Sequence, residues 1–327
     1  MADWTKLSVR IVVAGGMLCT MALGGRLLPA RAEPQGVLGQ HLELLDRNAG
    51  YFGAKNMDAL AKDLTEDYER TGLVGDKKAK RKEIAELQQL FATATDLHEA
   101  SQTSRLTVQG GDATTPTVAT TLVQTSRSAT VKDPGGKLHS MTWEIVDNEQ
   151  RISTPDGWRC RQRVELKNRV TMDGAPYLHL KTPAAAETRD RIQRAYNSLA
   201  KAFNTGDGNL ARTILAVGFE SRSIDDKSLT ADLWLAEIER RRKEAWRSDG
   251  SYEIEAISVD GDRATVGSRH NLLRQAADKE GIIHMVRETD SSRDNWQKTA
   301  QGWKLLKSET LLAETDVVQP VHAAGWR

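Results

Sequence analysis

The sequence repeats a short motif at a distance that fits one small domain. Residues 153–159 read Ser-Thr-Pro-Asp-Gly-Trp-Arg and residues 298–304 read Lys-Thr-Ala-Gln-Gly-Trp-Lys, so both contain T-x-x-G-W followed by a basic residue. The two tryptophans, Trp158 and Trp303, are 303 − 158 = 145 residues apart. Upstream, residues 108–114 resemble residues 259–265. A repeat of this period predicts two copies of one structural unit.

Each copy opens with a pattern typical of two consecutive helices. In the first copy, residues 44–52 and 56–64 are separated by a break at Gly53, and in the second, residues 192–203 and 210–215 are separated by Gly206-Asp207-Gly208-Asn209. A third helix follows in each copy, over residues 84–94 and 235–246, where apolar residues recur at spacings of three and four.

The second half of each copy has the composition of strands. Residues 117–131 are rich in Thr and Val, and Asp133-Pro-Gly-Gly136 predicts a hairpin turn. After Gly157, one set of alternating residues is mainly apolar (158, 160, 164 and 166) and the other is charged (159, 161, 163, 165 and 167). We expect the charged set to face water. Helices followed by long strands predict an α+β fold with the helices on one side of a curved antiparallel sheet.

The N-terminus has the three parts of an export signal. Lys6 and Arg10 precede the uncharged run 11–25, and Ala30-Arg31-Ala32 matches a cleavage site. We therefore predict a signal peptide over 1–32, domain 1 over 37–172, a linker over 173–186, domain 2 over 187–318 and a tail over 319–327. The protein would be exported to the periplasm or the extracellular medium. A retained membrane anchor is the alternative, although the uncharged run is shorter than the ~20 residues that a spanning helix needs.

The charge of the mature chain gives little attraction to nucleic acid. Cleavage after Ala32 removes four of the 46 basic residues and one of the 45 acidic residues, which leaves 42 − 44 = −2. We expect no nucleic-acid partner and, after cleavage, no stable membrane anchor. Cys160 would be the one remaining cysteine, so an intramolecular disulfide is excluded for the mature chain. Its phase with Trp158 predicts a small buried side chain.

Several segments resemble the nuclear-transport-factor-2-like superfamily, which includes SnoaL-like and ketosteroid-isomerase-like domains. They are the helix–Gly206-Asp207–helix opening, Leu64-Thr65-Glu66-Asp67-Tyr68, and the pairs Gly157-Trp158 and Gly302-Trp303. The resemblance implies two tandem cone-like domains that cover most of the chain. Members include isomerases, cyclases, dehydratases, ligand carriers and dimerisation modules, so the fold leaves the function open.

The resemblance also directs the search for a catalytic base. In the family, the base lies roughly 17 residues after the glycine of the helix–turn–helix opening. The same count leads from Gly206 to Ser223, beside Asp225, and from Gly53 to Arg70. The slot of the family's helix-one tyrosine falls at Leu199 rather than Tyr196. If domain 2 is an enzyme, we expect Asp225 to act with His270 and His284, the histidines on its predicted strands. A solvent-exposed loop at Asp225 is the structural alternative.

The other candidate pocket residues are His139, Trp143, Trp158, Trp296 and Trp303. Histidine on an inward-facing strand would line the cone, and tryptophan could either bind a ligand or fill the core. The histidine spacing matches no metal motif, and there is no phosphate-binding loop, so we predict neither a metal nor a cofactor.

Two functions remain open from the sequence. The first is an exported tandem protein without assigned activity that binds a small apolar ligand or mediates protein association, including sheet packing within the chain or between copies. The second is a SnoaL-type or isomerase-type enzyme that uses a pocket Asp or His in domain 2 as its general base. The two differ in whether carboxylates or histidines converge inside a cone.

Overall fold

The computed structural model describes residues 33–109, 117–178, 180, 182–244, 248–277 and 283–320. The chain divides into two compact units, one built on the elements up to β7 and the other on those from α4 onward. The predicted signal peptide, residues 1–32, lies outside the described residues, as does the end of the predicted tail. None of the described helices is both long enough and apolar enough to span a membrane.

The described residues of unit 1 form three helices and seven strands. The helices are α1 (Glu33–Gly53), α2 (Met57–Lys62) and α3 (Lys80–Thr93). The strands are β1 (Leu64–Thr71), β2 (Lys77–Ala79), β3 (Ala94–Gln109), β4 (Val118–Lys132), β5 (Leu138–Thr154), β6 (Gly157–Met172) and β7 (Ala175–Pro176). They form one sheet in the order β2-β1-β6-β5-β4-β3, with the short β7 paired to β6.

Unit 2 repeats this plan. Its helices are α4 (Pro183–Thr205), α5 (Gly208–Ile214) and α6 (Ala231–Glu244). Its strands are β8 (Leu215–Arg222), β9 (Ser228–Thr230), β10 (Ser248–Asp260), β11 (Arg263–Ala277), β12 (Ile283–Thr299) and β13 (Gly302–Pro320). The sheet order is β10-β11-β12-β13-β8-β9, the unit 1 order read in reverse, and β8 pairs with β13 in parallel as β1 does with β6.

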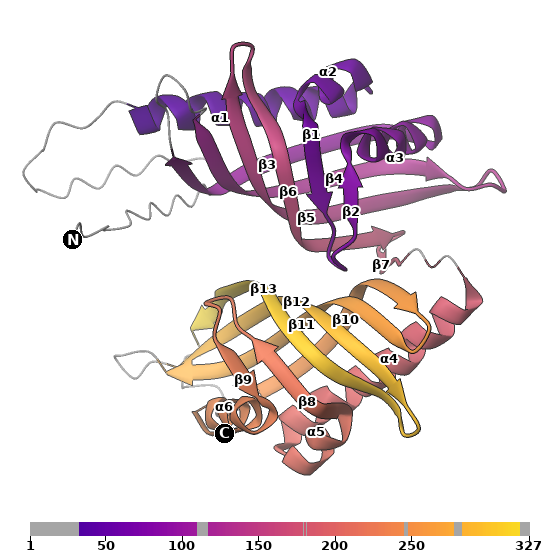
Figure 1. Cartoon of the computed structure of the whole chain (residues 1–327), viewed down its shortest axis with the longest axis vertical. Helices are drawn as coiled ribbons and strands as arrows, with labels where there is room; N and C mark the ends of the chain where they lie inside the picture. Colours follow the sequence, from indigo (N-terminus) through magenta and orange to yellow (C-terminus); the bar gives the residue numbers. More distant parts are fainter. Residues whose placement is uncertain are drawn as a thin grey trace, which may run out of the picture. The chain divides into compact units, whose positions relative to one another are not determined.

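Both units are α+β, with long, strongly curved strands on one side and helices on the other (Figure 1). This confirms the predicted fold class. Of the residues 173–186 predicted as a linker, Ala175–Pro176 form β7 and α4 begins at Pro183. Thr182 caps α4, because its side chain accepts a hydrogen bond from the backbone N–H of Ala185.

The repeated T-x-x-G-W motif forms the same hairpin in each unit. The Thr154 hydroxyl donates to the Gly157 carbonyl at 2.6 Å, and the Thr299 hydroxyl donates to the Gly302 carbonyl at 2.9 Å. Both glycines have positive φ, 110° and 103°, which a residue with a Cβ rarely adopts. The glycine is therefore required by the turn, and the tryptophan after it starts the last long strand.

The helix–turn–helix openings also correspond. Asn56 caps α2 and Asp207 caps α5, each accepting a hydrogen bond from the backbone N–H three residues later. Lys55 and Gly206, directly before these caps, both have positive φ. The two capping residues are 207 − 56 = 151 residues apart, whereas the Gly-Trp hairpins are 145 residues apart. An offset of 151 therefore aligns the helical parts of the two units, and an offset of 145 aligns their late strands.

One expectation about β6 is wrong. The charged set of its residues was expected to face water, yet Glu165 is buried and the side chain of Arg163 is 17% exposed. Cys160 is also buried, although it lies an odd number of residues from both. The buried charges are paired inside unit 1, because Arg163 lies 2.6 Å from Glu149 and Glu165 pairs with Arg70. The pairing of β1 with β6 also changes register between Leu64 and Glu69.

Candidate functional site

Unit 2 encloses a cavity of about 200 Å³ between its helices and its sheet. Tyr196, Leu199 and Phe203 reach it from successive turns of α4, because residues three and four apart share a helix face. The strands and α6 supply the rest of the wall, including Trp234, Tyr252, His270, Leu272, Arg274, Glu288, Asp290, Asp294, Leu305, Ser308 and Thr310.

A buried carboxylate lies in this wall. Asp294 on β12 is 2% exposed and its Oδ2 accepts hydrogen bonds from the hydroxyls of Tyr196 and Ser268, the latter at 2.6 Å. Its other oxygen, Oδ1, is buried and has no hydrogen-bond partner among the described residues. Burial raises the pKa of Asp294, and this effect outweighs the lowering by the hydroxyls of Ser268, Ser308 and Tyr196. The cavity therefore contains a carboxyl group with an unused acceptor.

Aromatic rings hold this carboxylate in place. Tyr196 lies edge-on to Trp296, whose indole N–H donates to the Tyr196 hydroxyl at 3.2 Å. On its other side, Tyr196 stacks on Tyr252 with ring centres 5.0 Å apart, and Tyr252 stacks on His270 at 4.4 Å. The three stacked rings form one rigid side of the cavity, since each ring is fixed by its neighbour.

The charged groups of the wall are mostly acidic. Among the described residues they are Glu237, Glu288, Asp290 and Asp294, against Arg274 and the histidine His270. Arg274 donates two hydrogen bonds, at 2.9 and 2.6 Å, to the same oxygen of Glu288, so its charge is already neutralised. Asp290 lies 3.9 Å from Nδ1 of His270. The cavity thus combines apolar walls with a surplus of carboxylates.

The corresponding space in unit 1 is a cavity of about 60 Å³, filled by ion pairs. Arg151 lies 3.0 Å from Asp63 and 2.9 Å from Glu149, and Arg163 lies 2.6 Å from Glu149. Arg70 pairs with Glu83 at 3.1 Å and also with Glu165. All of these side chains are largely buried, so the charges must stabilise one another.

Register explains why the two cavities differ. In the parallel pair of unit 1, Arg70 lies opposite Arg163, and in unit 2, Ser221 lies opposite Ser308. Ser308 and Arg163 differ by 308 − 163 = 145, and Ser221 and Arg70 differ by 221 − 70 = 151, the two offsets that align the units. Two serines in unit 2 thus take the place of two arginines in unit 1. The shorter side chains leave the space that the arginines fill.

Only one of the three predicted catalytic residues lines the cavity. His270 does, whereas Asp225 is exposed in the turn between β8 and β9, and His284 lies near the start of β12, outside the cavity wall. Asp225 therefore does not share this cavity with His270, as the sequence-based hypothesis required of Asp225 and at least one of the two histidines. The count from Gly206 passed the end of β8 and reached the hairpin turn, where a carboxylate meets solvent.

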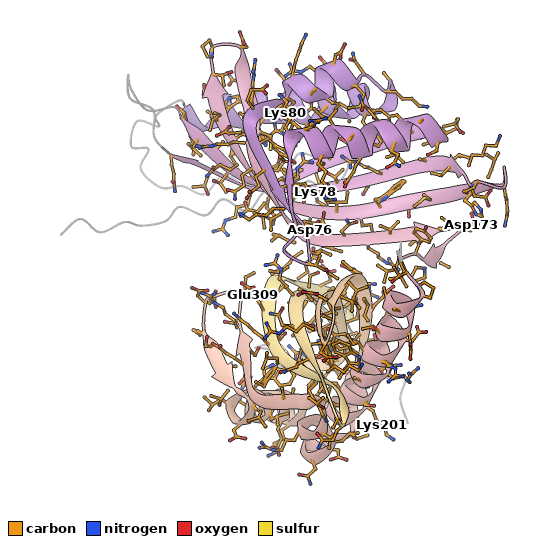
Figure 2. All side chains as sticks on the ribbon, turned by 45° about the vertical axis from the view of Figure 1, so that its right-hand side comes forward. Asp76, Lys78, Lys80, Asp173, Lys201 and Glu309 are labelled. Carbon is orange, nitrogen blue, oxygen red and sulfur yellow. The ribbon has the colours of Figure 1, made fainter. Side chains whose placement is uncertain are left out.

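The predicted pocket residues of the first copy have structural roles. The two ring nitrogens of His139, near the start of β5, form hydrogen bonds with Asp173 at 2.8 Å and Asp133 at 3.4 Å. These hydrogen bonds raise the pKa of His139, that with Asp173 most. Asp173 lies in the turn after β6 (Figure 2). His139 therefore joins two turns and does not line the unit 1 cavity.

The tryptophans pack into the cores rather than into a ligand cage. Trp143 contacts the cluster around Phe52 and Phe91, and the Trp158 indole donates to Gln40 at 3.0 Å. Trp296 and Trp303 belong to the main core of unit 2, and neither lines its cavity. That these four tryptophans contact a ligand stays a prediction.

Asp294 and Tyr196 were not among the site residues predicted from the sequence. Tyr196 was set aside in favour of Leu199, yet both line the cavity because they are three residues apart on α4. For Asp294, a signal exists in the repeat: it precedes Trp303 by nine residues, as Glu149 precedes Trp158. An acidic residue at the same interior strand position in both copies indicates a buried carboxylate.

Comparison with known proteins was informative only at the level of structure. No family model matches the chain, and no curated protein does so. Similar solved structures include a ketosteroid isomerase-like protein from Erwinia carotovora atroseptica, with 20% identity, 41% of this chain and 98% of that chain covered, and a TM-score of 0.30.

Two further similar structures were found. An NTF2-like protein with a cystatin-like fold from Novosphingobium aromaticivorans has 14% identity, covers 40% of this chain and 90% of its own, and gives a TM-score of 0.31. A type 2 hexachlorocyclohexane dehydrochlorinase has 9% identity. The match covers 43% of this chain and 97% of that chain, with a TM-score of 0.36. At these identities the likeness concerns the fold alone.

Proposed function

We propose that unit 2 binds a small, largely apolar molecule that donates a hydrogen bond to Asp294. The observation that carries this proposal is the Oδ1 atom of Asp294, which is buried at a cavity wall without a partner. A buried acceptor without a donor is costly, and a bound ligand can supply that donor. The leucine and aromatic side chains of α4 and α6 would contact the apolar part.

Titration with 2-phenylethanol, followed by ligand-observed NMR, tests this proposal. We expect binding to the full chain, weakened about tenfold or more (~1.4 kcal/mol) by Ser308→Leu, which fills the cavity. The matched control is Ser251→Leu at an exposed position of β10, which should leave binding unchanged. Equal affinity in the two variants would place the ligand elsewhere and refute the proposal.

A second function, acid–base catalysis in the same cavity, is favoured by one observation. Asp294 and His270 line the same space, and burial raises the pKa of Asp294 toward the range in which a carboxylate is an effective base. In this version of the hypothesis, Asp294 takes the role of Asp225 as the base, and His270 is the histidine that lines the same cavity.

Catalysis is tested by following α-proton exchange of cyclohexanone in deuterated buffer by NMR. An active base would accelerate exchange above the buffer rate, and Asp294→Asn would abolish the acceleration whereas Asp225→Asn would not. Exchange at the buffer rate with the unmodified protein would leave ligand binding as the function.

We also propose that the protein is exported and cleaved after Ala32. The support is the basic, apolar and Ala-x-Ala sequence of residues 1–32. Cleavage there would leave every described helix and strand intact.

A further inference from the structure

The acidic surplus of the unit 2 cavity restricts the chemistry of its ligand. Arg274, the one Lys or Arg of the wall in the described part of the chain, is held by Glu288. Glu237 is paired with Arg240 at 2.7 Å. Two carboxyl groups, Asp290 and Asp294, then have only His270 as a nearby basic group. A carboxylate ligand entering this space would meet like charges without a cationic partner.

The acidic residues are accompanied by an independent sign of a ligand. Asp294 is almost fully buried and its Oδ1 accepts no hydrogen bond, while its Oδ2 is occupied by Tyr196 and Ser268. The hydroxyl groups that act on this carboxylate, those of Tyr196, Ser268 and Ser308, are all neutral, so none of them balances its charge. The group best suited to Oδ1 is therefore one that brings both a proton donor and a positive charge.

The wall also suits the rest of such a molecule. Trp234 and Phe203 lie with ring centres 5.3 Å apart at one side of the cavity, and Leu199 and Leu305 line it as well. These side chains favour an apolar body, while aromatic faces also attract cations. An apolar skeleton ending in an ammonium group would thus match both parts of the cavity.

We propose that the ligand of unit 2 is an organic amine with an apolar body, whose ammonium group binds between Asp294 and Asp290. This inference rests on the proposed ligand-binding function and adds the class of ligand to it. The ammonium would donate to Oδ1 of Asp294, and its charge would be balanced by the two carboxylates. Asp290, which is closer to solvent, would attract the amine at the entrance.

The test compares three probes with one skeleton: 2-phenylethylamine, 2-phenylethanol and phenylacetate. Each is titrated into the full chain at low ionic strength and neutral pH by calorimetry or ligand-observed NMR. We expect the amine to bind about tenfold or more tightly than the alcohol, and phenylacetate to bind most weakly. Added salt should weaken the binding of the amine and leave the affinity for the alcohol unchanged.

Variants locate the preference. Asp290→Asn with Asp294→Asn should lower the affinity for the amine about tenfold or more and the affinity for the alcohol much less, because the amide oxygens still accept a hydrogen bond but carry no charge. Asp225→Asn removes a carboxylate outside the cavity and should keep the preference. If the alcohol or phenylacetate binds as tightly as the amine, the amine proposal is wrong but the binding function stands. If none of the three binds, both are refuted.

Discussion

Tyr196 on α4 donates its hydroxyl hydrogen to Asp294 on β12, and the same hydroxyl accepts the indole N–H of Trp296 at 3.2 Å. One phenol thus links a helix to the sheet and fixes the orientation of the cavity carboxylate. The oxygen that faces away from Tyr196 is the one without a partner. The hydrogen bond therefore both stabilises unit 2 and fixes which carboxylate oxygen is left without a donor.

Replacement of Tyr196 by phenylalanine should destabilise unit 2. The variant leaves the Trp296 indole without its acceptor and removes one donor from Asp294, so we expect a loss of about 1–3 kcal/mol in the free energy of unfolding. Urea denaturation measures the loss. Tyr252→Phe is the control, because no hydrogen bond of the Tyr252 hydroxyl is found in the described part of the chain. Equal losses in the two variants would contradict this role of Tyr196.

The stability of unit 1 should depend on the titration of Asp147. Burial raises the pKa of Asp147 to about 7, against the opposing charges of Arg163 and Arg70. Because its pKa in the unfolded chain is about 3.9, Asp147 favours folding most at low pH, and this contribution is lost as the pH rises from about 4 through 7. Asp147→Asn, which does not titrate, should flatten this decline.

Hydrogen exchange of β4 and β5 peptides, measured between pH 5 and 8 and corrected for intrinsic exchange, reports this effect in unit 1. Glu149→Gln is the contrasting variant. Burial alone would raise the pKa of Glu149, but the charges of Arg163 and Arg151 lower it to about 2. The ionised Glu149 therefore stabilises the fold at neutral pH. Its loss should cost about 3–5 kcal/mol. A pH profile identical in Asp147→Asn and the unmodified protein would show that Asp147 does not titrate in this range.

Cys160 should be unreactive in the folded protein. Its side chain is buried and burial raises the pKa of the thiol to about 12, so almost no thiolate is present at neutral pH. Iodoacetamide should leave the Cys160 peptide unmodified under native conditions and alkylate it fully in denaturant, as read by mass spectrometry. Rapid alkylation of the native protein would mean that β6 opens readily.

The fold was accessible to sequence analysis because its signals are local. The T-x-x-G-W turn requires glycine, and Asp207 caps a helix, so both identify equivalent points in the two copies. The site was not accessible in the same way. Tyr196 and Asp294 meet only because α4 packs across the sheet. Asp225, two residues beyond the position that the family spacing gives, lies in a solvent-exposed turn.

The charged residues of β6 show a second limit of pattern analysis. Arg163 and Glu165 alternate with apolar residues as a solvent-facing set would, but four arginines and several acidic residues gather inside unit 1. Their mutual pairing cannot be inferred from hydropathy, because hydropathy assigns every charge to solvent. The register shift in the β1–β6 pair has no signature in the sequence either.

Export predicts a defined N-terminus. If the signal segment is removed after Ala32, protein recovered from the periplasm or medium should begin at Glu33 by N-terminal sequencing or intact mass. Substituting Ala32 by a bulky residue should block processing. A recovered protein that retains residues 11–25 would show that the segment serves as an anchor.

The most direct test of the account is a crystal structure of the full chain soaked with 2-phenylethylamine. The account predicts density in the cavity of unit 2, with the amine nitrogen within hydrogen-bond distance of Asp294 Oδ1 and the ring against Trp234 and Leu199. The smaller, arginine-filled cavity of unit 1 should be empty of the probe. Density only outside unit 2, or a bound ring whose amine points away from Asp294, would contradict it.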